Sequence, residues 1–126
     1  MNILDYLDYQ TLLLTADKVH LKIEVTPRLY QPFGVLHGGI NGLLIETACS
    51  LGAMQNVLSD EVAVGLDLQV SHLKAVTTGS LEIIATPDKI GKTLQVWQAS
   101  IYQGTTKTAV GRCSLLNTKI KKAENP

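Results

Sequence analysis

One long apolar stretch, residues 39–58, limits what this chain can fold into more than any other feature. It contains no proline, and a helix drawn through it has no wide polar face. A helix that is apolar nearly all round is a buried helix, and twenty residues at about 1.5 Å each span roughly 30 Å, the diameter of a small domain. We therefore predict a central helix, with apolar positions at Ile40, Leu43, Leu44, Ile45, Ala48, Leu51, Ala53, Met54, Val57 and Leu58.

The only carboxylate within this stretch is Glu46. Burying an unpaired charge costs several kcal/mol, so this acid needs a physical explanation. At about 100° per residue, Glu46 shares a helix face with Gly39, Gly42, Ser50 and Ala53. These small residues leave room for another backbone or a ligand. Glu46 is therefore either a hydrogen-bonded structural acid or a functional group beside a binding site.

Composition narrows the class of protein. The 126 residues fit one domain, 1–126, and the eleven basic and eleven acidic residues give no net charge. Without a basic cluster we expect no nucleic-acid partner, and no apolar stretch is long enough for a membrane span. Acids stand where a signal peptide carries Lys or Arg, which favours the cytoplasm. Cys49 and Cys113 form no metal-binding pattern, so we expect no metal and read both as apolar fillers.

The rest of the chain alternates apolar and polar residues with the period of a strand. In residues 62–70 this pattern is clearest, and His72 and Lys74 continue its apolar face. Short connections allow hairpins but not helical crossovers, so the sheet should be antiparallel. We predict an α+β fold in which a curved sheet of five or six strands wraps around the helix. A short segment at 1–9 and a polar tail at 119–126 flank strands at 11–14, 19–26, 62–73, 81–86, 94–102 and 108–118.

The segment Gln-Pro-Phe-Gly-Val-Leu-His-Gly-Gly at 31–39, followed by Glu46, resembles the signature of the phenylacetate-type thioesterases. That group includes 4-hydroxybenzoyl-CoA and 1,4-dihydroxy-2-naphthoyl-CoA thioesterases and has the hotdog fold. Residues 64–74 and 95–98 are also similar, and the resemblance extends from about 21 to 116. It implies an acyl-CoA thioesterase that hydrolyses an aromatic or medium-chain thioester. Coenzyme A is then part of the substrate, and no cofactor is expected.

The resemblance also implies roles for individual residues. The amide of Gly38 would bind the thioester carbonyl, and Glu46 would act as nucleophile or as general base on water. Ser50 would hydrogen-bond that carboxylate or the water. The remaining positions would orient or bind the substrate: Gln31 and His37 near the carbonyl, Gly39 and Gly42 against the acyl group, and His72 and Lys74 toward coenzyme A. For His72 and Lys74 a structural histidine and a solvated lysine remain open alternatives.

A distance argument adds an expectation about assembly. Gly38 and Glu46 are eight residues apart, a rise of about 12 Å along one helix, which a glutamate side chain cannot span. We therefore predict that the amide and the carboxylate of one site come from two subunits with antiparallel central helices. The resemblance implies that the two sheets join through the strand at 62–73, and pairing there would also cover an exposed edge. The resemblance further implies a tetramer built from such dimers.

Two other functions are compatible with a hotdog fold. Hotdog enoyl-CoA hydratases use an aspartate and histidine pair near the helix, whereas here a glutamate stands nine residues after His37. A noncatalytic acyl-CoA-binding module would not need Gln31, Glu46 and Ser50 together. Both alternatives are therefore weaker than the thioesterase interpretation.

Overall fold

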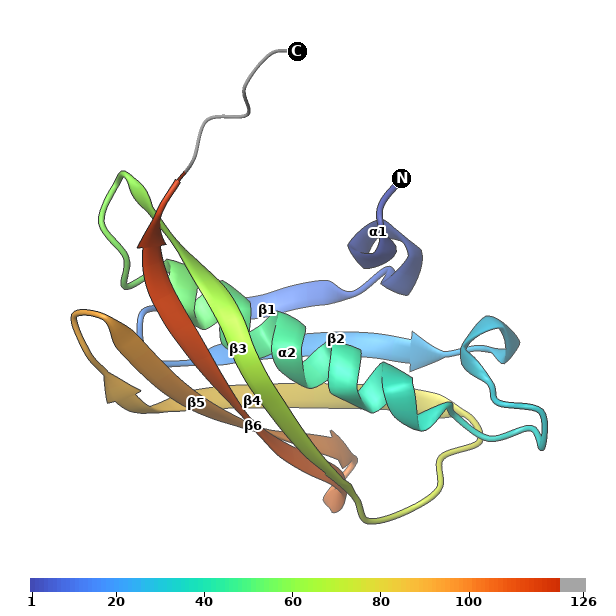
Figure 1. Cartoon of the computed structure of the whole chain (residues 1–126). Coiled ribbons are helices and arrows are strands. Elements are labelled where there is room, and N and C mark those ends of the chain that lie inside the picture. Colours follow the sequence, from blue (N-terminus) through green and yellow to red (C-terminus); the bar gives the residue numbers. More distant parts are fainter. Residues whose placement is uncertain (121–126) are drawn as a thin grey trace.

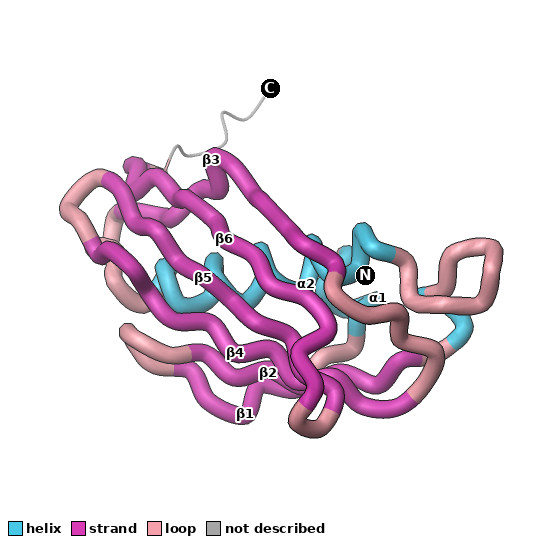
Figure 2. The backbone as a smooth tube through the Cα atoms, turned by 90° about the horizontal axis from the view of Figure 1, so that it is seen from below, coloured by secondary structure: helices cyan, strands magenta, loops and turns pink. Residues whose placement is uncertain are grey.

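The computed structural model describes residues 1–120, which form one antiparallel sheet and two helices. The strands lie in the order β1-β2-β4-β5-β6-β3, so β1 and β3 are the two edges (Figure 2). The sheet curls around the long helix α2 (Figure 1), which confirms the predicted α+β hotdog architecture. The elements are α1 (Ile3–Leu7), β1 (Gln10–Leu14), β2 (Val19–Val25), a 3-10 turn (Pro27–Leu29), α2 (Gly38–Met54), β3 (Glu61–His72), β4 (Gly79–Ile90), β5 (Leu94–Gln103) and β6 (Thr106–Lys119). Most of the predicted polar tail lies outside the described residues.

Helix α2 ends at Met54, four residues before the predicted end at Leu58. Hydrogen bonds close it early: the N–H of Gln55 donates to the carbonyl of Gly52 at 3.0 Å. The side chain of Asn56 donates to the same carbonyl and to a carbonyl before β2. The prediction that the helix continues to Leu58 is therefore wrong, because these polar groups turn the chain toward β3.

The sheet side of α2 forms the core, and β5 fixes its C-terminal end. Gln95 donates from Nε2 to the carbonyl of Ala53 at 3.0 Å and accepts from Trp97 Nε1 at 2.9 Å. Gly52 makes this packing possible, because a Cβ there would lie 2.5 Å from the Trp97 ring. The other side of α2 is partly accessible, and Met54 is 39% exposed. A single chain therefore does not bury α2 on all sides, in contrast to the prediction from its apolar sequence.

Strand β3 contains a β-bulge that divides its apolar pattern in two. Gly65 pairs with Leu115, and Leu68 pairs with Cys113; both partners are buried residues of β6. Between these two pairs β3 has two residues, Leu66 and Asp67, where β6 has only Ser114, and Leu66 is the extra residue. Residues paired across antiparallel strands share a face, so the even positions face α2 only after the bulge. The prediction of one continuous apolar face from Val62 to Lys74 is wrong for this reason.

Strand β4 continues past the predicted end at Thr86 and runs through Pro87 to Ile90. The register of β4 against β5 shifts between Pro87 and Lys89. Proline cannot donate to a sheet ladder and is accepted at such bulges. The proline therefore marks an irregularity within the strand and not its end.

The β3 edge is long and apolar. It has 12 residues, and Val64 is 45% and Leu66 56% exposed. A long exposed edge offers unpaired N–H and C=O groups to another strand, and proteins seldom leave one uncovered. This edge is suited to pairing with another chain.

Candidate functional site

A cavity of about 330 Å³ lies at the N-terminal end of α2, and we call it the Gly38 cavity. The loop after the 3-10 turn supplies one wall, α2 begins at its floor, and the end of β3 closes the other side. It brings together four of the predicted site residues, Gln31, Gly38, His72 and Lys74, with Asn41 beside them. Of the residues predicted to orient or bind the substrate, Gln31, His72 and Lys74 therefore share this cavity with Gly38, whereas His37, Gly39 and Gly42 do not line it.

The first turn of α2 presents one free backbone donor to this cavity. The N–H of Gly39 donates to Nδ1 of His37 at 2.8 Å, and the N–H of Ile40 donates to the His37 carbonyl at 2.9 Å. Within residues 1–120, the N–H of Gly38 has no such partner. It also lies at the positive end of the helix dipole, where an anion is stabilised. This amide can therefore hold a carbonyl oxygen that becomes negative during a reaction.

His37 and Gly39 stand at the rim of this arrangement. His37 is exposed and caps α2, and its ring fills the space that a Cβ on Gly39 would occupy, 2.9 Å from Nδ1. Neither residue lines the Gly38 cavity in one chain. Gln31 does line it. Its Oε1 accepts from the N–H of Phe33, which leaves the amide nitrogen as the group that can donate to a ligand.

A second cavity of about 330 Å³, the Glu46 cavity, lies further along α2. Glu46 and Ser50 both line it, as the predicted catalytic pair requires, although no hydrogen bond joins them in the described chain. No described residue forms an ion pair with the Glu46 carboxylate. The other lining residues are Thr47 and four apolar ones, of which α1 supplies the first two: Ile3, Leu4, Leu51 and Met54. Nothing in the sequence pattern indicated that the N-terminal helix would cover this acid.

Gly65 makes room for the carboxylate of Glu46. A Cβ on Gly65 would lie 2.6 Å from Oε1 of Glu46, closer than any real contact allows. The sequence analysis did not select this glycine. Its signal was an isolated glycine within a strand pattern, which marks a bulge or a close approach.

The two cavities have no lining residue in common. Gly42 lies between them and lines neither, because it packs under β3, with its Cβ position 3.5 Å from Leu68 Cδ2. Gly38 and Glu46 are therefore on separate surfaces of one chain, as their spacing along the helix required.

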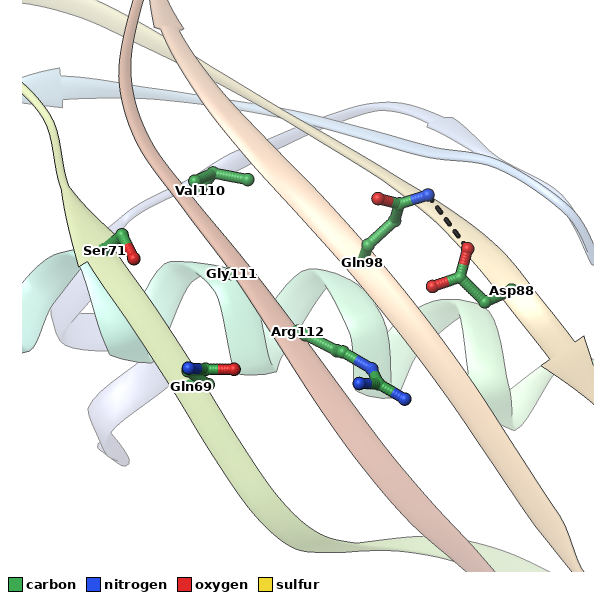
Figure 3. A pocket seen from close by; sticks show the side chains of 7 residues that line it. All are labelled: Gln69, Ser71, Asp88, Gln98, Val110, Gly111 and Arg112. Carbon is green, nitrogen blue, oxygen red and sulfur yellow. Dashed lines mark hydrogen bonds between the residues drawn. The ribbon is translucent and has the colours of Figure 1, made fainter.

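A third cavity, of about 250 Å³, opens on the face of the sheet opposite α2 (Figure 3). Its side chains come from four strands and include Arg112, and Gln98 donates from Nε2 to Asp88 Oδ1 at 2.9 Å. None of the predicted site residues lines it. Within residues 1–120, no three His, Cys, Asp or Glu side chains gather as metal ligands, and no helix has the length and apolarity to cross a membrane.

Both cysteines are buried free thiols close to Glu46. Burial raises the pKa of the Cys113 thiol to about 11, and the charges of Glu46 and Asp67 add to the effect. Burial, followed by the charges of Cys113 and Glu46, raises the pKa of Cys49 well above its ordinary value. Both thiols therefore stay protonated at neutral pH, as apolar fillers would.

These pKa shifts predict how stability depends on pH. The unfolded thiols ionise near pH 8.5 and the folded ones only at higher pH, so the unfolded state gains relative stability as pH rises. The loss should reach about 2 kcal/mol per thiol by pH 10. Urea unfolding of the wild type and of the double variant Cys49→Ala/Cys113→Ala, at pH 7.5 and pH 10, measures it. The same pH dependence in both proteins would contradict this prediction.

A curved antiparallel sheet wrapped around one long helix defines the hotdog fold. Residues 33–110 match the model of the Thioesterase superfamily, so the chain belongs to this family and is a thioester hydrolase. It is 37% identical over 106 residues to a 1,4-dihydroxy-2-naphthoyl-CoA hydrolase of Listeria monocytogenes, which covers 83% of this chain and 86% of the relative.

Two further comparisons agree with this assignment. The chain is 30% identical over 100 residues to the proofreading thioesterase EntH of Cronobacter turicensis, covering 79% of this chain and 73% of the relative. The crystal structure of a thioesterase from Haemophilus influenzae superposes with a TM-score of 0.89 at 30% identity. That superposition covers 98% of this chain and 87% of the other.

Proposed function

We propose that this protein is an acyl-CoA thioesterase that releases the free acid and coenzyme A from an aromatic or medium-chain acyl-CoA. The observation that carries the proposal is the unpaired Glu46 carboxylate at the wall of an apolar cavity. Glu46 is half-buried, and no described residue forms an ion pair with its carboxylate. An acid with a structural role would be expected to have a hydrogen-bond or ion-pair partner there. An acid kept for reaction with substrate or water has a reason to remain unpaired.

The proposed chemistry uses only protein groups and water. The N–H of Gly38 donates to the thioester carbonyl and stabilises the negative oxygen of the tetrahedral intermediate. The Glu46 carboxylate either attacks the carbonyl carbon, forming an anhydride that water then cleaves, or takes a proton from the water that attacks. In both routes the carbon–sulfur bond breaks and coenzyme A leaves as a thiol. Ser50 lines the same cavity and is placed to hold the carboxylate or the water.

The proposed site is shared between two subunits. The separation of the Gly38 and Glu46 cavities leaves each chain with two half-sites. Antiparallel pairing of two β3 edges would cover Val64 and Leu66 and set two α2 helices side by side in opposite directions. The Glu46 cavity of one subunit would then face the Gly38 cavity of the other. A tetramer made of two such dimers remains part of the proposal.

The cavity walls suggest how the substrate is divided. Ile3, Leu4, Leu51 and Met54 give the Glu46 cavity an apolar lining suited to an acyl group. His72 and Lys74 line the Gly38 cavity, through which the coenzyme A arm would leave, with Lys74 toward its phosphates. The relative named as a naphthoyl-CoA hydrolase makes a bicyclic aromatic acyl group a good first candidate.

A panel of acyl-CoA thioesters tests this function. Thiol release should be measured with 1,4-dihydroxy-2-naphthoyl-, 4-hydroxybenzoyl-, phenylacetyl-, octanoyl- and acetyl-CoA. Aromatic or octanoyl thioesters should be hydrolysed with a higher kcat/KM than acetyl-CoA, because only they fill the apolar cavity. Binding of these thioesters without thiol release above background would contradict the proposal.

A further inference from the structure

Asn41 is a buried polar residue to which the proposed mechanism gives no role. It lies one turn into α2, is 6% exposed, and lines the Gly38 cavity. Its Nδ2 is 3.1 Å from Nδ1 of His72, at the end of β3. Its Oδ1 is buried without any hydrogen-bond partner in the described chain. A buried unpaired acceptor costs about 1 to 3 kcal/mol, so this asparagine is not explained by stability alone.

The Asn41 amide sets the position of the proton on the His72 ring. An amide NH₂ group is only a donor, so the His72 nitrogen it meets must be the bare acceptor of the neutral ring. The proton of neutral His72 is then on Nε2. The tautomer follows from this orientation of the amide, in which Nδ2 and not Oδ1 faces the ring. In the reverse orientation Oδ1 would accept from an Nδ1–H, so the two orientations predict opposite tautomers.

The same geometry places the protonated nitrogen next to Gly38. A Cβ on Gly38 would lie 2.9 Å from Cε1 and 3.0 Å from Nε2 of His72. The ring edge that carries Nε2 thus rests against the first residue of α2, and both residues line the Gly38 cavity. Only glycine at position 38 lets the ring come so close. The free N–H of Gly38 and the Nε2–H of His72 are neighbouring donors at one cavity.

We propose that Asn41 is a positioning residue that holds His72 as the Nε2–H tautomer, so that His72 is a second donor to the thioester oxygen beside Gly38. This inference rests on the proposed function for its substrate but not for its geometry. A neutral second donor stabilises the oxyanion of the intermediate without taking up a proton. Transition-state stabilisation of this kind lowers kcat when it is lost and leaves KM nearly unchanged.

The imidazole ¹⁵N resonances of the full chain, labelled at histidine, test the tautomer directly. The signals of His72 are identified by their loss in His72→Gln. The wild type at pH 8 should show the Nε2–H pattern, Asn41→Leu a mixture of both tautomers, and Asn41→Asp mainly Nδ1–H, because a carboxylate can only accept. An Nδ1–H pattern in the wild type, or an unchanged pattern in Asn41→Leu, would overturn the assignment of Asn41.

Kinetics with the best thioester of the panel test the consequence. Asn41→Leu should lower kcat about tenfold, the worth of one hydrogen bond. His72→Leu should lower it about a hundredfold, whereas His72→Gln, which keeps an N–H donor, should retain more activity than His72→Leu. Equal kcat values for His72→Gln and His72→Leu would overturn the donor role. If the wild type releases no thiol, the proposed function fails, and the NMR result still decides the role of Asn41.

Discussion

Glu46→Gln should lower kcat for acyl-CoA hydrolysis by about a thousandfold and leave the protein folded. The amide fills the same space as the carboxylate but can neither attack a carbonyl carbon nor take a proton from water. Glu46 lines an apolar cavity without an ion pair in the described chain, so removing its charge breaks no stabilising contact. Steady-state thiol release and thermal unfolding measure the two parts of this prediction.

Two matched variants make the Glu46 test specific. Glu82→Gln removes a partly buried acid that pairs with His20 at 2.9 Å and lines neither the Gly38 nor the Glu46 cavity, so its kcat should stay at the wild-type value. Gly65→Ala keeps Glu46 but puts a methyl group 2.6 Å from its carboxylate oxygen, so it should lower kcat about tenfold by displacing the acid. If Glu46→Gln instead unfolds the protein, the acid is structural and the catalytic proposal is wrong.

Mixing two inactive variants should restore activity, because the proposed site takes one group from each subunit. Glu46→Ala lacks the acid and Gly38→Pro lacks the helix N–H. Proline is well accepted at the first position of a helix, and the extended conformation of His37 (φ −64°, ψ 131°) suits a residue before proline. After denaturation and refolding in equal amounts, half of the dimers are mixed and each has one intact site. The mixture should therefore recover about a quarter of the wild-type activity.

The reciprocal mixture is the control. Wild type refolded with an equal amount of the double variant Gly38→Pro/Glu46→Ala gives mixed dimers in which both sites lack one group. Activity should then be about a quarter of the wild-type value, and about a half if each chain held a complete site. Gly38→Ala keeps the N–H but displaces His72, and it separates loss of the donor from disturbance of the ring. No recovery in the first mixture would contradict the shared site.

Most of the fold could be predicted because it follows from local periodicity. Six alternating segments and one apolar run with few turns between them leave little choice besides a sheet wrapped around a helix. What failed depends on contacts across the structure. The end of α2 is set by the side chain of Asn56, and the course of β4 through Pro87 by its register against β5. Neither can be read from a repeat pattern.

The candidate site shows the same division. The resemblance at 31–46 selected Gln31, Gly38 and Glu46, and the spacing of the last two predicted that they would lie apart. The sequence analysis did not select Asn41 and Gly65, because their importance comes from partners 31 and 19 positions away, at His72 and Glu46. An asparagine in an apolar helix is ordinary alone, and an isolated glycine in a strand indicates a close approach without identifying the partner. Only the folded chain shows which side chains these two residues contact.

The bulge at Leu66 has a consequence for anyone aligning or redesigning this strand. Deleting that single residue would join Gly65 to Asp67 in a regular ladder and leave both halves paired with β6 as they are, so no side chain would change face. The strand would lose the local bend and the extra twist that the bulge gives it, and its free edge would take a different course. Before the bulge the odd-numbered residues of β3 face α2, and after the bulge the even-numbered residues do. Substitutions should therefore be transferred from relatives only between positions on the same side of the bulge.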